Sequence, residues 1–244
     1  MNPDRLQSEV LILAGGTSSR MGLPKPLLLW EGIPLWFHIA RKAATFALKV
    51  RIVGFPEGVD NRFFLENEFS FINDRLRVGP LGGLLLGLEQ MQTPHALVIA
   101  CDMPFISSEA TAELLNCSEN QDVVIPRTTD GLHPLFSLYS CKCIHAVRES
   151  LDAGERKIRA FFPKVKVREI ATGESALNWN KILFNINSPQ DYSRALHLNG
   201  SAPSAPLVSS HFSVPFTSGQ AAVHEQQNLN LGGKIAKKQP LSAI

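Results

Sequence analysis

The segment EVLILAGGTSSRMGLPK, residues 9–25, joins an apolar run to a loop rich in anion-binding groups. Its first six residues are typical of a short buried strand. Gly15 and Gly16 follow directly, and two glycines after a strand let backbone N–H groups turn toward an anion. Three hydroxyl side chains come next, and Arg20 and Lys25 add two cations that suit phosphate oxygens. The pattern predicts a loop that holds a nucleoside triphosphate.

Two common phosphate-binding patterns do not describe this loop. It lacks G-x-x-x-x-G-K-[ST] and also G-x-G-x-x-G, so a P-loop NTPase and a dinucleotide-binding enzyme both fit badly. The nucleotide-binding residues that we expect here are Leu13, Ala14, Gly15, Gly16, Arg20 and Lys25.

Outward from this segment, short apolar runs alternate with helix-like patterns to about residue 196. We expect strands at residues 9–14, 50–54, 69–73, 96–101, 122–126, 134–139, 164–170 and 182–186. We expect helices at residues 34–48, 81–91, 108–116, 144–153 and 189–196, the third capped by Ser107. Strands that alternate with helices predict a Rossmann-like three-layer α/β sandwich with a mostly parallel mixed sheet. Ligands of such folds bind at the carboxyl ends of the strands.

Composition divides the chain in two. Residues 1–197 are predicted to form a single domain, whereas residues 198–244 are rich in Ser, Pro, Gly, Ala, Gln and Asn and predict a flexible tail. A docking peptide in that tail is the weaker alternative. The net charge of +2 argues against a nucleic-acid partner, and the lack of a long apolar run argues against a membrane. We therefore expect a cytoplasmic protein whose four cysteines are reduced structural thiols.

The loop string G-G-x-x-x-R-M-G-x-x-K resembles the signature of the molybdenum cofactor guanylyltransferases, within the nucleotidyltransferase superfamily. The resemblance runs in the family's order from about residue 9 to residue 196 and leaves out the tail. It rests on five further segments, which are IND with GPLGG (72–83), ACDMPF (100–105), GLHPL (131–135), LDAGER (151–156) and FNINSP (184–189).

The resemblance implies a reaction and a metal. Asp102 follows a buried strand, and in the family the matching carboxylate binds Mg²⁺ and touches the nucleotide. GMP would pass from GTP to the molybdopterin-bound molybdenum cofactor and release pyrophosphate. Lys25 and Arg20 would offset phosphate charge, and magnesium would be held by Asp102. No protein nucleophile is needed. The resemblance also implies a monomer that interacts with other proteins of cofactor assembly.

The sequence says less about which nucleotide is bound and which residues contact the acceptor. Asp74 can accept hydrogen bonds from N1–H and the N2 amine of guanine, although a plain turn residue is the alternative. Gly54 stands where the family often has an asparagine that contacts the nucleotide. His133 and Asn187 are the acceptor-side candidates, and each also has a structural interpretation.

Several alternatives stay open from the sequence. The basic residues Arg156, Lys157 and Arg159 either hold an acceptor phosphate or form a solvated turn. Competing functions are cytidylyl transfer to the same pterin, nucleotidyl transfer to a sugar phosphate, and a nucleotide-binding regulator without catalysis.

Overall fold

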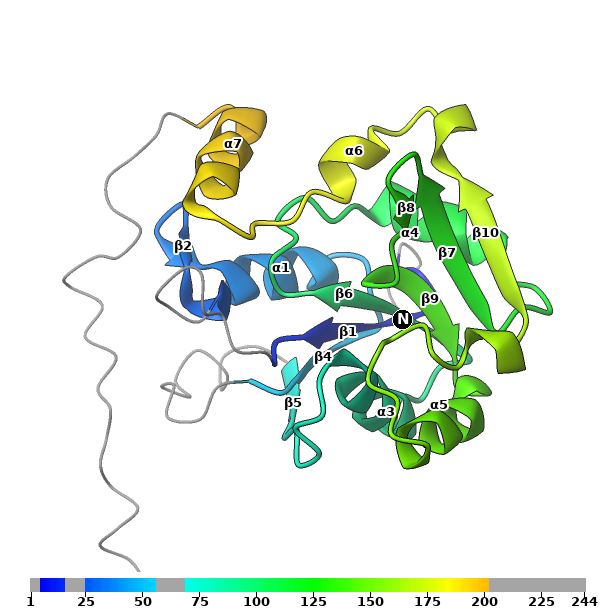
Figure 1. The fold of residues 1–244 in the computed structure, drawn as a ribbon. Coiled ribbons are helices and arrows are strands. Elements are labelled where there is room, and N and C mark those ends of the chain that lie inside the picture. Colours follow the sequence, from blue (N-terminus) through cyan, green and yellow to red (C-terminus); the bar gives the residue numbers. More distant parts are fainter. Residues whose placement is uncertain (1–4, 16–24, 56–68, 202–244) are drawn as a thin grey trace, which may run out of the picture.

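The computed structural model describes residues 5–15, 25–55 and 69–201, and Figure 1 shows how their elements are arranged. These residues form one α/β domain in three layers, as predicted, with a central sheet between two layers of helices. No helix in the described ranges is long and apolar enough to cross a membrane.

The central sheet has eight strands among the described residues, in the order β10-β7-β9-β6-β1-β4-β5, with β8 paired to β7. The strands are β1 (Glu9–Leu13), β4 (Lys49–Val53), β5 (Phe69–Ile72), β6 (His95–Ala100), β7 (Val123–Thr128), β8 (Gly131–Leu132), β9 (Phe136–Ser140) and β10 (Val167–Ala171). The pairs β1–β4, β1–β6, β4–β5 and β7–β10 are parallel. Only β8 and β9 run against their neighbours, so the sheet is mixed and mostly parallel.

Two hydrophobic clusters cover the two faces of the sheet. One lies under α1 (Leu35–Ala44), α4 (Ser108–Asn116), α6 (Trp179–Ile182) and α7 (Pro189–Asn199), and the other lies under α3 (Pro80–Gln90) and α5 (Cys143–Asp152). Helix α3 packs closely on β1 because Gly87 has no side chain. A Cβ on Gly87 would stand 2.8 Å from Cδ1 of Leu11, closer than real contacts allow.

The predicted helix at residues 34–48 ends early. Helix α1 stops at Ala44, and the N–H of Leu48 donates to the carbonyl of Ser8 at 3.0 Å. That bond holds the chain beside the residue before β1, so β4 begins at the next residue, Lys49. By contrast, the predicted cap of α4 is confirmed, because the Ser107 hydroxyl accepts from the N–H of Ala110 at 3.2 Å.

The expected strand at residues 182–186 is wrong. Ile182 ends the short helix α6, and residues 183–187 form a turn and an irregular segment that joins no sheet. The N–H of Ile186 donates instead to the carbonyl of Asp102 at 2.9 Å. Ile182, Leu183 and Ile186 are buried because this run packs against the core beside the sheet, although it is not part of the sheet. The hairpin of β2 (Leu29–Trp30) with β3 (Ile33–Pro34), and the short strand β8, were not expected from the sequence.

Candidate active site

The carboxyl ends of β1, β4 and β5 bring together three residues that are far apart in the sequence. Gly15, Gly54 and Asp74 each follow one of these parallel strands. A Cβ placed on Gly54 would lie 3.1 Å from Cα of Gly15 and 3.2 Å from Cβ of Asp74. Gly54 has a φ of +73°, a conformation that favours glycine. The asparagine expected from the resemblance is therefore replaced by a residue that lets the first loop and Asp74 approach each other.

The carboxylate of Asp74 is oriented by its own turn. Its Oδ1 accepts from the N–H groups of Arg77 at 2.9 Å and Leu76 at 3.2 Å. Its Oδ2 lies 3.6 Å from the position that a Cβ on Gly15 would take. Asp74 is thus a turn residue and also presents an oxygen toward the loop after β1, so the two interpretations of this residue are compatible.

Leu13 and Ala14 take part in the site through their backbone and not through their side chains. Both side chains are buried in the core. The carbonyl of Leu13 accepts from the N–H of Cys101 at 3.2 Å, and the N–H of Ala14 donates to the carbonyl of Val53 at 2.8 Å. Leu13 and Ala14 therefore shape the start of the loop. Gly16 and Arg20, which the sequence assigns to the same loop, lie outside the described residues.

Asp102 lies just past the end of β6, in the turn formed by residues 101–106. It is 8 % exposed, and its turn is held to neighbouring segments by the bonds of Cys101 to Leu13 and of Ile186 to Asp102. Its Oδ1 is buried and has no hydrogen-bond partner among the residues that the structure describes. Burial of a carboxylate oxygen without a partner is unfavourable. The turn thus holds an anionic oxygen that is ready to accept a cation.

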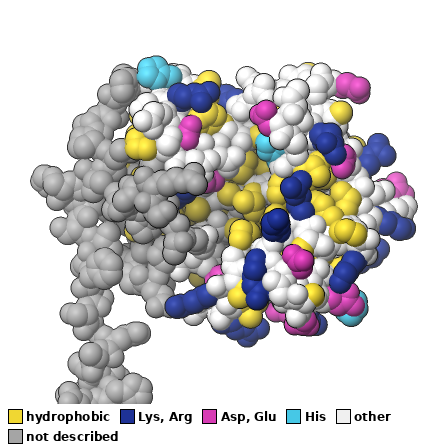
Figure 2. Space-filling model, viewed as in Figure 1, with side chains coloured by type: hydrophobic (Ala, Val, Ile, Leu, Met, Phe, Trp, Pro, Cys, Tyr) yellow, Lys and Arg dark blue, Asp and Glu magenta, His cyan; other side chains and the backbone are white. Residues whose placement is uncertain are grey.

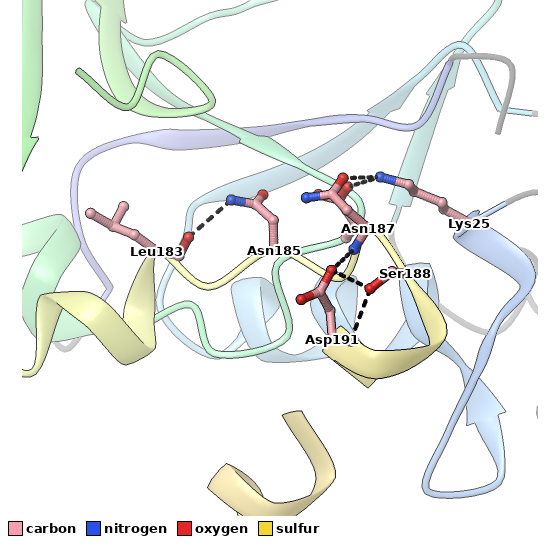
Figure 3. Close-up of polar contacts among 7 residues, drawn as sticks. Lys25, Leu183, Asn185, Asn187, Ser188 and Asp191 are labelled. Atoms are coloured by element: carbon pink, nitrogen blue, oxygen red, sulfur yellow. Dashed lines mark hydrogen bonds and ion pairs between the residues drawn. The ribbon is translucent and has the colours of Figure 1, made fainter. Parts of the chain in front are cut away.

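Lys25 connects this turn to the segment before α7. Its Nζ donates to Oδ2 of Asp102 at 2.7 Å and to Oδ1 of Asn187 at 2.5 Å. Figure 3 shows the Lys25 side chain pointing toward Asn187, which lies 162 residues away in the sequence. The ammonium group therefore joins three segments that meet at the carboxyl edge of the sheet.

The segment that carries Asn187 is anchored at both ends. Ser188 caps α7 by accepting from the N–H of Asp191, and the Asp191 carboxylate accepts from the N–H of Asn187 at 3.2 Å (Figure 3). The side chain of the nearby Asn185 donates to the carbonyl of Leu183 instead of pointing to Lys25. Of these two asparagines, Asn187 is the one placed in the site.

His133 lies on the same edge of the sheet, because β9 runs antiparallel and begins beside the end of β6. The N–H of Ala100 donates to the carbonyl of Leu135 at 3.1 Å, two residues after His133. Nε2 of His133 is 2.8 Å from Oγ1 of Thr128, and burial lowers the pKa of the ring. Among the described residues, His133 makes no hydrogen bond to Lys25, Asp102 or Asn187. It belongs to a separate part of the site.

The surface near β9 combines apolar and basic groups. Figure 2 shows hydrophobic side chains gathered on the face over β9 with Lys and Arg side chains among them. Half-buried Leu132, Leu135, Ile158 and Phe162 pack here against the core under α5. Arg156 donates from Nη1 to the carbonyls of Glu155 at 2.8 Å and Leu151 at 3.2 Å, which closes the end of α5. Arg156 therefore has a structural role, whatever it also binds.

The fold also occurs in solved structures of other proteins. The structure of molybdopterin-guanine dinucleotide biosynthesis protein A from Archaeoglobus fulgidus superposes with a TM-score of 0.68 at 25 % identity, covering 79 % of this chain and 98 % of that one. A 2-C-methyl-D-erythritol 4-phosphate cytidylyltransferase from Thermus thermophilus, 16 % identical, shares the fold with a TM-score of 0.56.

Similarity to a family model and to curated relatives identifies the chain, which carries this lysine and carboxylate at the edge of its sheet, as a nucleotidyltransferase. The model of the MobA-like NTP transferase domain matches residues 10–168, and the chain belongs to that family.

Two relatives carry the same name. A probable molybdenum cofactor guanylyltransferase from Pelotomaculum thermopropionicum is 35 % identical over 192 residues, covering 78 % of this chain and 92 % of the relative. A protein of the same name from Nostoc sp. is 31 % identical over 188 residues, covering 74 % of this chain and 86 % of the relative.

Proposed function

We propose that this chain transfers GMP from GTP to the molybdopterin-bound molybdenum cofactor and releases pyrophosphate. The observation that carries the proposal is the meeting of Lys25, Asp102 and Asn187 at the carboxyl edge of the sheet. A cation and a buried carboxylate at this position suit a reaction in which charge on phosphates must be neutralised and the reacting groups aligned. The names of the relatives favour the guanylyl reaction over the alternatives.

Asp102 has the properties of a magnesium ligand. Its Oδ1 is a buried anionic oxygen that no described residue contacts through a hydrogen bond, and its Oδ2 accepts from Lys25. The described residues contain no group of three or more His, Cys, Asp or Glu that could hold a metal ion. Magnesium does not need one here, since it commonly uses one or two carboxylates and takes its other oxygens from phosphates and water. When bound, the ion would neutralise charge that develops on the phosphates.

In the proposed reaction an oxygen of the acceptor's phosphate forms a bond to the α-phosphorus of GTP. The bond from that phosphorus to the bridging oxygen breaks, and pyrophosphate leaves with the electron pair. Lys25 would offset the charge of the phosphates from the position where it now joins Asp102 and Asn187. No side chain forms a covalent intermediate. Burial raises the pKa of the Cys101 thiol well above its usual range, which argues against this neighbour of Asp102 as a nucleophile.

The guanine base would lie at the ends of β1, β4 and β5. Oδ2 of Asp74 faces the loop after β1, while turn amides hold Oδ1 in place. An oriented carboxylate oxygen accepts from N1–H or the N2 amine of guanine, whereas cytosine offers no such pair of donors. Gly54 supplies no side-chain contact of its own, and its missing side chain lets the loop after β1 lie close to Asp74.

The acceptor would approach from the side of β9. His133 and Asn187 lie at the carboxyl edge of the sheet. The exposed Lys157 and Arg159 stand on either side of the half-buried Ile158 in the sequence. An apolar surface with cations beside it suits a flat heterocycle that carries a phosphate. The second function to be tested is cytidylyl transfer to the same pterin.

The test is a comparison of the four nucleoside triphosphates. The purified full-length chain is incubated with Mg²⁺, molybdopterin-bound molybdenum cofactor and each triphosphate, and pyrophosphate release is followed. We expect pyrophosphate release in the sample with GTP and in none of the samples with the other three triphosphates. Release with CTP and not with GTP would contradict the guanylyl assignment. Tight GTP binding without release for any acceptor would favour a nucleotide-binding regulator.

A further inference from the structure

The three segments that build the site rest on one group of rings around Trp30. The fully buried Trp30 contacts His38 with ring centroids 5.7 Å apart, Phe105 at 5.7 Å and Tyr192 at 6.3 Å. We call these four residues the Trp30 cluster. Its members come from β2, α1, the turn after β6, and α7.

Each site residue is close in sequence to a member of this cluster. Lys25 precedes Trp30 by five residues, Asp102 precedes Phe105 by three, and Asn187 precedes Tyr192 by five. A bond of 2.5 Å from the Tyr192 hydroxyl to the carbonyl of Leu29 ties α7 to the hairpin after Lys25. The cluster therefore sets the relative positions of the three segments.

His38 is the member of the cluster that acts on the Asp102 turn through a hydrogen bond. Its Nε2 lies 3.2 Å from the carbonyl oxygen of Pro104. A carbonyl only accepts, so Nε2 must carry the proton. Burial lowers the pKa of His38 below its usual 6.5, which keeps the ring neutral and Nδ1 unprotonated at pH 7. The imidazole thus supplies a single oriented donor to a buried turn.

We propose that His38 is a positioning residue for nucleotidyl transfer, which holds the Asp102 carboxylate in place through the carbonyl of Pro104. This inference rests on the proposed function. His38 makes no hydrogen bond to Lys25, Asp102 or Asn187 within the described residues, so it acts through the turn and touches no reacting atom. Because Asp102 lies only two residues before Pro104, a shift of the Pro104 carbonyl is passed on to the carboxylate.

The expected fall in kcat follows from the sensitivity of an aligned reaction to small displacements of a catalytic group. A misplacement of about 1 Å lowers the rate of a well-oriented reaction by about 100-fold. The neighbouring rings and the bond from Ile186 to Asp102 limit the movement of the turn. We therefore expect loss of the His38 bond to lower kcat by about 10-fold and to leave the KM for GTP within about twofold.

The test uses a matched set of histidine variants. His38→Leu removes the donor and keeps the apolar bulk, whereas His38→Gln can place an amide N–H near the position of Nε2. His95→Leu is the control, since Nε2 of His95 also lies 3.1 Å from a backbone carbonyl, that of Gln121, and His95 is half-buried at the opposite end of β6. For each variant, kcat, KM and the thermal midpoint are measured. Backbone amide NMR shifts at Asp102, Met103 and Phe105 provide a readout that does not depend on activity.

The proposal expects a 10-fold loss of kcat and shifted turn amides in His38→Leu, and recovery of most of both in His38→Gln. Both readouts stay normal in His95→Leu. Equal kcat in His38→Leu and His95→Leu would overturn the proposal, as would shifted amides with normal kcat. If the wild type itself transfers no nucleotide, the proposed function fails. That outcome differs from an active wild type whose His38 variants are equally active.

Discussion

Replacement of Asp102 by asparagine separates the charge of this residue from its shape. Asparagine fills the same volume, and the backbone bond from Ile186 to the Asp102 carbonyl is retained. The amide oxygen can still accept from Lys25 at the position of Oδ2, which is 2.7 Å from Nζ. The amide nitrogen then takes the position of Oδ1 and presents N–H groups where a cation is expected. The variant therefore loses the anionic oxygen and little else.

The magnitude follows from the burial of this carboxylate. Removal of one group that stabilises transition-state charge in a water-poor site lowers kcat by about 10²- to 10³-fold. Asp102 is 8 % exposed, so little solvent screens the change. For stability, loss of the ion pair with Lys25 is offset by removal of a buried charged oxygen that has no hydrogen-bond partner within residues 5–15, 25–55 and 69–201. We expect the thermal midpoint to change by less than about 4 °C, or roughly 1 kcal/mol for a domain of this size.

The assay measures pyrophosphate release with GTP and acceptor at saturation, and thermal unfolding of the same samples. Glu119→Gln is the matched control, because it neutralises an exposed acid in the connection between α4 and β7. A kcat of Asp102→Asn within about threefold of wild type would refute a charge role for this residue. A fall of the midpoint by more than about 10 °C would show that Asp102 serves folding.

Four further variants have expected outcomes. Glu9→Gln leaves Arg51 charged and 5 % exposed without its 2.5 Å partner, so urea unfolding should show a loss of about 3–5 kcal/mol. Glu169→Gln breaks an exposed pair of the same 2.5 Å length and should leave the urea midpoint unchanged; equal losses in both variants would contradict the burial argument. Gly54→Ala places a methyl group at a φ of +73° against the loop, so the KM for GTP should rise about 10-fold while kcat holds, and an unchanged KM would remove Gly54 from the nucleotide site. Truncation after Ser201 should preserve kcat and KM, and a strong loss in the same kinetic assay would show that residues 202–244 contribute to the site.

The pattern of strands and helices was largely readable from the sequence, since periodicity and capping are local properties. The run from Glu9 to Leu13 predicts a buried strand, which is β1 in the structure, and the glycines after it predict a loop. Ser107 marks the start of α4, because its side-chain hydroxyl accepts from the N–H of Ala110 in the first turn. The error at residues 182–186 has the same origin. An apolar run looks alike whether it pairs in a sheet or packs over the edge of one.

What the sequence determined by itself was therefore the set of residue types at the strand ends and the class of fold that carries them. The tertiary structure decided which of those residues meet. Lys25 contacts Asp102 across 77 residues and Asn187 across 162, and His38 reaches Pro104 across 66. Contacts at such separations depend on the order of the strands and on how the segment after α6 crosses the sheet edge. No local pattern encodes that order, because it is set by the packing of the whole domain.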